Sequence, residues 1–223
     1  MILLLSMEMN SQPRKILLAP HNDDEALFAS FICMREKPTV VIVTDSWRQF
    51  KRGEKDITAE VRREESRKAM QLLGCPIIFL GISDNKLRWE NICKALAQFD
   101  PDDIVYAPAI QGGNVQHDLI GCAALKYFKN VIQYTTYSKN ALYTEGEVEI
   151  IPSDEERALK EQALLCYKSQ ITYNRTSKHF EAIQGKNEWI ITNIRLRWFY
   201  VMYYETRHLL WRLKRKIKTL CQH

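Results

Sequence analysis

The sequence has no apolar run that approaches the roughly 20 residues needed to cross a bilayer. The N-terminal run at residues 1–6 is too short for the apolar core of a secretory signal, and no basic residues flank it. None of the six cysteines forms a C-x-x-C pair, which excludes the usual spacing of a zinc–thiolate site. We therefore interpret the cysteines as free thiols in a reducing compartment and expect a cytoplasmic protein.

The chain also lacks an even spread of basic charge. Its formal net charge is +5, yet residues 207–223 alone contain six Lys or Arg and no acidic residue. The preceding part of the chain therefore carries a net charge of −1 and lacks the basic face of a nucleic-acid-binding domain. We expect no nucleic-acid partner.

Five short apolar runs alternate with segments of helical periodicity. Continuous apolar runs indicate strands that are covered on both faces, as in parallel sheets. The predicted strands cover residues 15–20, 39–45, 76–81, 103–108 and 131–136, and the predicted helices cover 24–34, 58–73, 89–99, 116–129 and 154–168. Gly74 marks the end of the second helix, and a capping box from Ser153 to Glu156 marks the start of the fifth. This order predicts an α/β fold with a Rossmann-like, doubly wound, mainly parallel sheet flanked by helices.

No internal repeat and no Gly/Ser-rich linker divides the chain. We expect residues 1–188 to form one α/β domain, in which 171–188 is a polar loop region, and residues 189–223 to form a basic amphipathic helix. This helix either packs on the domain with its Lys and Arg side chains solvated or lies peripherally on an anionic membrane surface. Glu205 interrupts the apolar stripe of the helix, which favours packing on the domain.

A histidine and three acidic residues follow the first predicted strand directly, in the order H-N-D-D-E at residues 21–25. His21 and Asp24 are three residues apart, so both can face one point across a strand-to-helix turn, and the two ligand types suit a divalent metal. Asp23 lies beside Asp24 and is placed to act as a general base. The structural alternative is that these acids only cap the following helix.

A catalytic zinc requires a third protein ligand and an open position. The fourth strand is followed by a Gly-Gly loop that leads to His117 at the start of a helix, which mirrors the first turn. The other histidines lie in the polar loop region or the basic C-terminal segment, so His117 is the best candidate. An isolated histidine is more often structural, but its position at a strand end favours a ligand. Two imidazoles and one carboxylate suit zinc and also ferrous iron.

Several motifs occur in a fixed order along residues 14–170. They are H-N-D-D-E at 21–25, T-D-S at 44–46, R-x-x-E with a following A and L-G at 62–74, F-L-G with a following D at 79–84, and Y-K-S-Q at 167–170. This ordered set resembles the PIG-L/LmbE-like zinc de-N-acetylase family. The resemblance implies a hydrolase that removes an N-acetyl group from an amino sugar or glycoconjugate by a metal-activated water. It implies Asp23 as the general base, with the metal held by His21, Asp24 and His117.

One motif departs from the family. Its second metal-binding motif is commonly H-x-D-H, whereas here residues 114–117 read N-V-Q-H. The first histidine of that motif assists the oxyanion, so the resemblance places Asn114 in this catalytic position, where an amide can donate a hydrogen bond but carries no charge. Arg62 and Glu65 are expected either to support the site from behind or to contact substrate.

Two other functions compete with the hydrolase. The replacements at Asn114 and Gln116 favour a catalytically impaired, metal-free member that keeps the fold and serves as a ligand-binding or scaffold protein. A nucleotide-binding domain is disfavoured, because the first strand is not followed by a G-x-G-x-x-G turn and an acidic turn would repel phosphate.

Overall fold

The computed structural model describes residues 13–46, 57–171, 174–193 and 197–220. The apolar run at residues 1–6 and most of the segment 46–58, whose lack of pattern suggested a pocket loop, lie outside these ranges. All five cysteines in the described part of the chain are free, as the sequence predicted, and Cys221 lies outside it. No helix of the described residues is long and apolar enough to span a membrane.

A seven-stranded sheet forms the centre of the fold, in the order β3-β2-β1-β4-β5-β7-β6. The first five strands are parallel, while β7 pairs antiparallel with both β5 and β6. The strands are β1 (Lys15–Ala19), β2 (Thr39–Thr44), β3 (Ile77–Ile82), β4 (Ile104–Pro108), β5 (Asn130–Tyr134), β6 (Val148–Ile150) and β7 (Glu188–Ile191). The doubly wound, mainly parallel sheet predicted from the apolar runs is confirmed.

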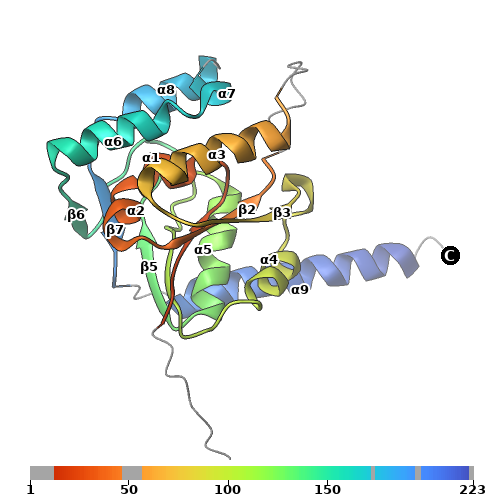
Figure 1. Ribbon diagram of the computed structural model, residues 1–223. Helices are drawn as coiled ribbons and strands as arrows, with labels where there is room; N and C mark the ends of the chain where they lie inside the picture. Colours follow the sequence, from red (N-terminus) through yellow and green to blue (C-terminus); the bar gives the residue numbers. More distant parts are fainter. Residues whose placement is uncertain (1–12, 47–56, 172–173, 194–196, 221–223) are drawn as a thin grey trace, which may run out of the picture.

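Helices cover both faces of the sheet, as Figure 1 shows. Successive residues of β1 alternate between the two cores: Leu17 and Ala19 face one, Ile16 and Leu18 the other. The first core is covered by α1 (Asp24–Phe28), α2 (Ser30–Glu36), α3 (Ala59–Leu73), α6 (Asp154–Leu164), α7 (Lys168–Ile171) and α8 (Asn174–Ile183). The second core is covered by α4 (Trp89–Leu96), α5 (Val115–Tyr127) and α9 (Arg197–Leu220), while a short 3-10 helix, η2 (Asp84–Lys86), precedes α4.

Two predicted helix ends are confirmed by their local geometry. Gly74 adopts a left-handed conformation (φ 68°) directly after α3, and its backbone N–H bonds to carbonyls of the last turn. The Ser153 hydroxyl accepts from the backbone of Glu156, whose carboxylate accepts from the backbone of Ser153, which completes the capping box of α6.

The helix predicted over 24–34 is interrupted, and its prediction as one helix is wrong. Ala29 leaves the helical conformation (φ −140°, ψ 21°), and α2 begins at the next residue. A buried carboxylate from β7 explains the new start, because Glu188 Oε2 accepts from the backbone N–H of Phe31 at 2.9 Å. The other oxygen of Glu188 bonds to Lys160 Nζ at 2.8 Å, and both side chains are buried.

Residues 171–188 are not a loop region, contrary to the sequence prediction. They contain α8, which buries Phe180 and Ile183 in the first core, and they lead into β7. The pairing of β7 with β5, more than fifty residues earlier, stabilises a strand that its local sequence does not reveal. The C-terminal helix, expected from residue 189, accordingly begins only at Arg197.

Candidate metal centre

The candidate site lies where the winding of the sheet reverses. Strands β1 and β4 are neighbours in the sheet, yet the chain proceeds from β1 outward to β2 and β3 and later from β4 outward to β5. The loops that leave the carboxyl ends of β1 and β4 therefore diverge to opposite faces, and ligands usually bind between such loops. His21 follows β1, and His117 lies in the first turn of α5, after β4.

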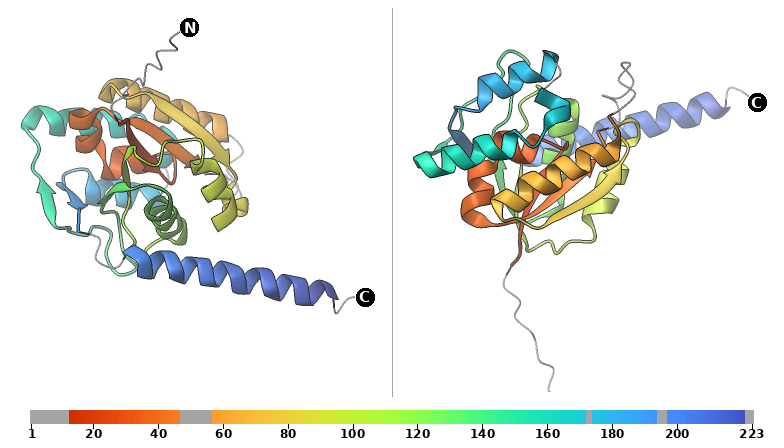
Figure 2. Two further views of the ribbon diagram at one scale, coloured as in Figure 1. Left: turned by 90° about the horizontal axis from the view of Figure 1, so that it is seen from below. Right: turned by 45° about the horizontal axis from the view of Figure 1, so that its top comes forward.

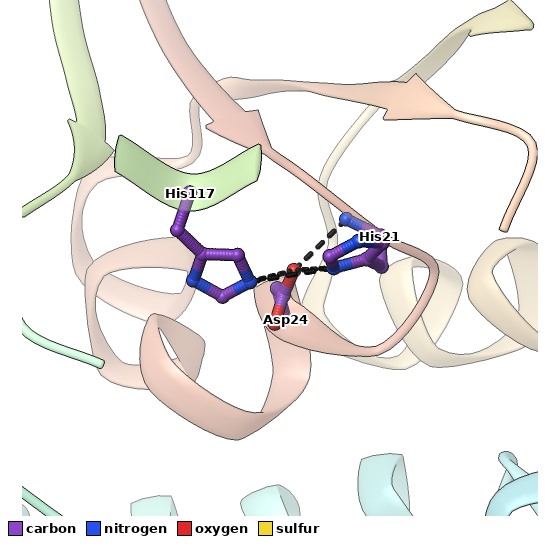
Figure 3. A group of neighbouring side chains, drawn as sticks. All are labelled: His21, Asp24 and His117. Carbon is purple, nitrogen blue, oxygen red and sulfur yellow. Dashed lines mark hydrogen bonds and ion pairs between the residues drawn. The ribbon is translucent and has the colours of Figure 1, made fainter. Parts of the chain in front are cut away.

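Three atoms form a nearly equilateral triangle between these two loops (Figure 3). Nδ1 of His21 lies 3.0 Å from Oδ2 of Asp24, Nε2 of His117 lies 3.2 Å from the same oxygen, and the two nitrogens are 3.3 Å apart. Ligands bound tetrahedrally to zinc at its usual bond lengths are about 3.3 Å apart, so the triangle has the dimensions of three corners of that site. The side chain of His21 is 12% exposed whereas those of Asp24 and His117 are 4% and 2% exposed, so access is from the His21 side.

The second nitrogen of each imidazole has its own partner. His21 Nε2 lies 2.5 Å from Oε1 of Gln116, and His117 Nδ1 lies 3.4 Å from the hydroxyl of Thr136. An N–H donated to an oxygen fixes the tautomer and leaves the other nitrogen's lone pair for a cation. Both rings can therefore present a lone pair to the triangle, which is the donor set that a divalent metal requires.

Electrostatics hold a negative charge on Asp24, at one corner of the triangle. Burial acts to raise the pKa of Asp24, but the positive charges of His117 and His21 outweigh burial, so the pKa of Asp24 lies below its usual value. Burial acts in the opposite direction on His21, and there the Asp24 carboxylate outweighs it and raises the pKa of the imidazole to about 9. The carboxylate is thus ionised and surrounded by groups that can exchange a proton for a cation.

Asp23 lies beside the triangle in a strained backbone conformation. Its φ of 147° is rare for a residue other than glycine, and its carbonyl accepts the first two backbone bonds of α1, from Ala26 and Leu27. Its Oδ2 lies 3.0 Å from Nη2 of the fully buried Arg62. Burial raises the pKa of Asp23 to about 7, although the charge of Arg62 opposes this shift. A carboxyl group with such a pKa can accept and release a proton near neutral pH.

Asn114 is the N-cap of α5 rather than an unengaged amide. Its Oδ1 accepts from the backbone of Gln116 at 2.8 Å, and its Nδ2 donates to the hydroxyl of Tyr137 at 2.9 Å. The Tyr137 ring lies 5.2 Å from that of His117, and burial raises the pKa of its hydroxyl, which stays protonated. Gly113 permits this arrangement, because a Cβ there would lie 2.2 Å from the carbonyl oxygen of Tyr137.

The two residues of the R-x-x-E motif act at different distances from the triangle. Both project from one buried face of α3, but only Arg62 reaches the turn between β1 and α1, where it contacts Asp23 and the carbonyl of Asn22. Glu65 instead accepts from the backbone and hydroxyl of Ser169, at 2.8 and 2.6 Å. The early and late motifs are thereby joined behind the site, away from the cation position.

Sequence reasoning missed three of the side chains that complete the site. Gln116 was noted only as a replacement, Thr136 was assigned to a strand, and Tyr137 was not considered. The position of Thr136 and Tyr137 at the carboxyl end of the fifth predicted strand was a usable signal, because the carboxyl end of β5 lies beside that of β4. Nothing in the local sequence indicated that Gln116 contacts His21, since the two residues are 95 positions apart.

Comparison with known families gives one match over half of the chain. Residues 16–128 match a family model described as PIG-L, GlcNAc-PI de-N-acetylase. This segment contains all three corners of the triangle together with Asp23, Arg62 and Asn114. No curated protein matched the chain.

Several solved structures share the fold at low sequence identity. The conserved protein TT1542 from Thermus thermophilus has a TM-score of 0.59 and 19% identity, covering 82% of this chain and 96% of its own. A deacetylase in complex with teicoplanin has a TM-score of 0.55 and 16% identity, covering 81% and 99%. GalB, the 4-carboxy-2-hydroxymuconate hydratase of Pseudomonas putida, has a TM-score of 0.55 and 13% identity, covering 77% and 84%. Because the fold is shared by a deacetylase and a hydratase, the reaction has to be argued from the site.

Proposed function

The chain belongs to the PIG-L (GlcNAc-PI de-N-acetylase) family, and on that basis we propose that it is a metal-dependent hydrolase that removes an N-acetyl group from an amino sugar or glycoconjugate. The observation that carries this proposal is the triangle of His21, Asp24 and His117 with the Asp23 carboxylate beside it. We place the hydrolase in the cytoplasm and assign it to the α/β domain through β7, with the C-terminal helix from Arg197 following it.

The residues present fit a divalent metal. Two imidazole nitrogens and one ionised carboxylate at mutual distances of 3.0–3.3 Å are a donor set for zinc, with ferrous iron as the alternative. When bound, such an ion is a Lewis acid that polarises a carbonyl and acidifies water. His21, Asp24 and His117 would hold it, and Gln116 and Thr136 would fix the two rings.

Asp23 is assigned the proton transfers. Its carboxylate would take a proton from the attacking water and return it to the amine nitrogen as the carbon–nitrogen bond breaks, so that acetate and a free amine are the products. Arg62, 3.0 Å from Oδ2, would hold the carboxylate in place and balance its charge within the buried turn. Glu65 would act only through packing, since its oxygens are used by Ser169.

Asn114 is assigned a role different from that of the histidine it replaces. Its amide holds the hydroxyl of Tyr137, which keeps its proton and whose ring lies beside that of His117. We therefore assign the hydrogen bond to the developing oxyanion to the pair of Asn114 and Tyr137 rather than to a charged imidazolium. Loss of that charge predicts slower turnover than in a member with the full H-x-D-H motif.

The substrate class follows from the family and not from a specific contact at the site. The family description names an N-acetylglucosamine conjugate, and one structural neighbour is a deacetylase in complex with teicoplanin. On this basis an N-acetylated sugar or glycoconjugate is the substrate class that we propose for this chain.

The test is release of acetate from a panel of N-acetylated sugars and glycoconjugates, with metal content measured on the same preparations. We expect about one zinc or iron per chain, activity on at least one substrate, and loss of both metal and activity in His21→Ala. His208→Ala, on α9, is the matched control and should retain both. A protein that holds no metal, or a His21→Ala variant with normal metal content, would contradict the proposal.

A catalytically impaired, ligand-binding member is the second candidate. The observation that favours it is the absence of both the histidine and the aspartate of the H-x-D-H pattern at Asn114 and Gln116. The same panel and metal analysis separate the two functions, because an impaired member would bind a glycoconjugate without holding a metal and without releasing acetate.

A further inference from the structure

Helix α9 presents two different sides, of which only one belongs to the fold. On the domain side Val201 is buried in the second core, and the Tyr204 ring stacks on Trp89 with the centroids 6.2 Å apart. Glu205 pairs with Lys126 of α5. These contacts attach α9 to α4 and α5, and they account for the one acidic residue of the helix.

The opposite side of α9 carries a stripe of exposed apolar side chains. The stripe consists of Phe199, Met202, Tyr203, Leu209, Leu210 and Leu213, which are 47–64% exposed. At about 100° per residue, these positions fall within an arc of roughly 120°, and Val201, Tyr204 and Glu205 fall outside it. Glu205 therefore does not interrupt the stripe, contrary to the expectation from sequence, because it faces the domain.

The helix also extends beyond the domain. Figures 1 and 2 show its C-terminal half running away from the sheet and from the other helices. Large apolar groups gathered on one side of a projecting helix indicate an interaction surface, since single scattered ones would need no explanation.

Charge decides between the two occupants that such a stripe could have. Residues 207–223 contain six Lys or Arg and no acid, and Arg207 and Lys214 are exposed beside the stripe. A second copy of α9 would bring like charges together, whereas an anionic bilayer would attract them. An apolar stripe with flanking basic residues is the pattern of a helix that lies in the plane of a membrane interface.

We propose that α9 binds the surface of an anionic bilayer, with the stripe from Phe199 to Leu213 inserted at the headgroup level and the basic side chains directed to lipid phosphates. This inference does not depend on the hydrolase activity, because α9 and the triangle share no residue.

The experiment is flotation of the full chain with vesicles of phosphatidylcholine alone or with about 30% phosphatidylserine, an anionic lipid that attracts basic segments. We expect binding to the anionic vesicles, weakened at high salt, and at least roughly tenfold weaker partitioning for the double variant Leu210→Asp/Leu213→Asp. Ile151→Asp/Leu165→Asp is the matched control, since both residues are at least as exposed as Leu210 and Leu213 but lie outside α9, and it should bind normally. Lys214→Glu/Lys218→Glu tests the charge without altering the stripe and should also weaken binding.

Three results would overturn the proposal. One is the absence of binding to the anionic vesicles, and another is equal binding by the two Asp double variants. The third is a dimer by sedimentation that Leu210→Asp/Leu213→Asp converts to a monomer without any vesicle binding, which would assign the stripe to a second copy of the chain. Circular dichroism of every variant checks that the fold is retained.

Discussion

Gln116 Oε1 lies 2.5 Å from Nε2 of His21, so a neutral amide oxygen contacts the first imidazole from the position where the family's H-x-D-H pattern has an aspartate. His21 therefore has a hydrogen-bond acceptor at Nε2 that carries no negative charge. Partners of this kind orient a metal-binding histidine and increase its basicity, and their removal typically weakens metal binding about 10- to 100-fold.

Gln116 is accordingly expected to set the metal affinity. Gln116→Leu should raise the dissociation constant for zinc by about 10- to 100-fold, because His21 loses the acceptor that fixes its tautomer. Gln116→Asp should bind zinc at least as tightly as the wild type, because an acceptor is kept at this position. Competition with a chelator of known affinity measures both, and Gln98→Leu, at an exposed glutamine on the surface, should show no change. An unaltered affinity in Gln116→Leu would mean that the contact does not support the metal.

Asp23→Asn should separate metal binding from turnover. The triangle is left intact, so the metal content should stay at the wild-type level, while the rate should fall about 10²- to 10⁴-fold because proton transfer is lost. Measurement requires the acetate-release assay with a substrate found in the panel, alongside metal analysis. Asp102→Asn, in a surface ion pair with Lys129, serves as the control and should keep full activity. Normal turnover in Asp23→Asn would remove this residue from the mechanism.

The buried pair of Lys160 and Glu188 should be important for stability. Lys160→Met leaves a buried carboxylate without its cation and should lower the free energy of unfolding by about 3–5 kcal/mol. The double variant Lys160→Met/Glu188→Gln should recover part of this loss, because glutamine is neutral and its oxygen can still accept from the Phe31 backbone. Urea denaturation measures the difference. If the double variant is no more stable than the single one, the unpaired charge is not the cause.

The ion pair of Arg35 and Glu156 should give a pH-dependent contribution to stability. The hydrogen bond from Arg35 lowers the pKa of Glu156 from 4.5 to about 2. Because this pKa is lowered by folding, the stabilisation is fully present above about pH 4.5 and is lost as the pH falls through about 2. At about pH 6, Glu156→Gln should be less stable than wild type by up to about 1 kcal/mol, since the pair is partly exposed.

The variant Glu156→Gln also tests the sign of this pH dependence. The difference between wild type and Glu156→Gln should narrow steadily between about pH 4.5 and about pH 3, measured by urea denaturation at each pH. Glutamine retains an oxygen for the capping box, so the narrowing reports on the charge alone. A difference that stays constant over this range would contradict the assignment.

The sequence alone determined the parallel part of the sheet and the two segments that carry the histidines of the site. Five apolar runs became the five parallel strands, because burial on both faces requires a continuous apolar sequence. Local rules of backbone conformation placed Gly74 and Ser153 at helix ends. His21 and His117 could be paired in advance, because both follow parallel strands and such strand ends meet at one edge of a sheet.

Only the tertiary structure decided the contacts between residues that are distant in the chain. The break at Ala29 depends on Glu188, 159 positions later, and β7 exists because it pairs with β5. The contact of Gln116 with His21 was likewise visible only in the fold. Glu205, which in the sequence interrupts an apolar stripe, contacts the domain in the structure. Local sequence determines which conformations a segment prefers, but long-range hydrogen bonds and ion pairs depend on what the completed fold brings within about 3 Å.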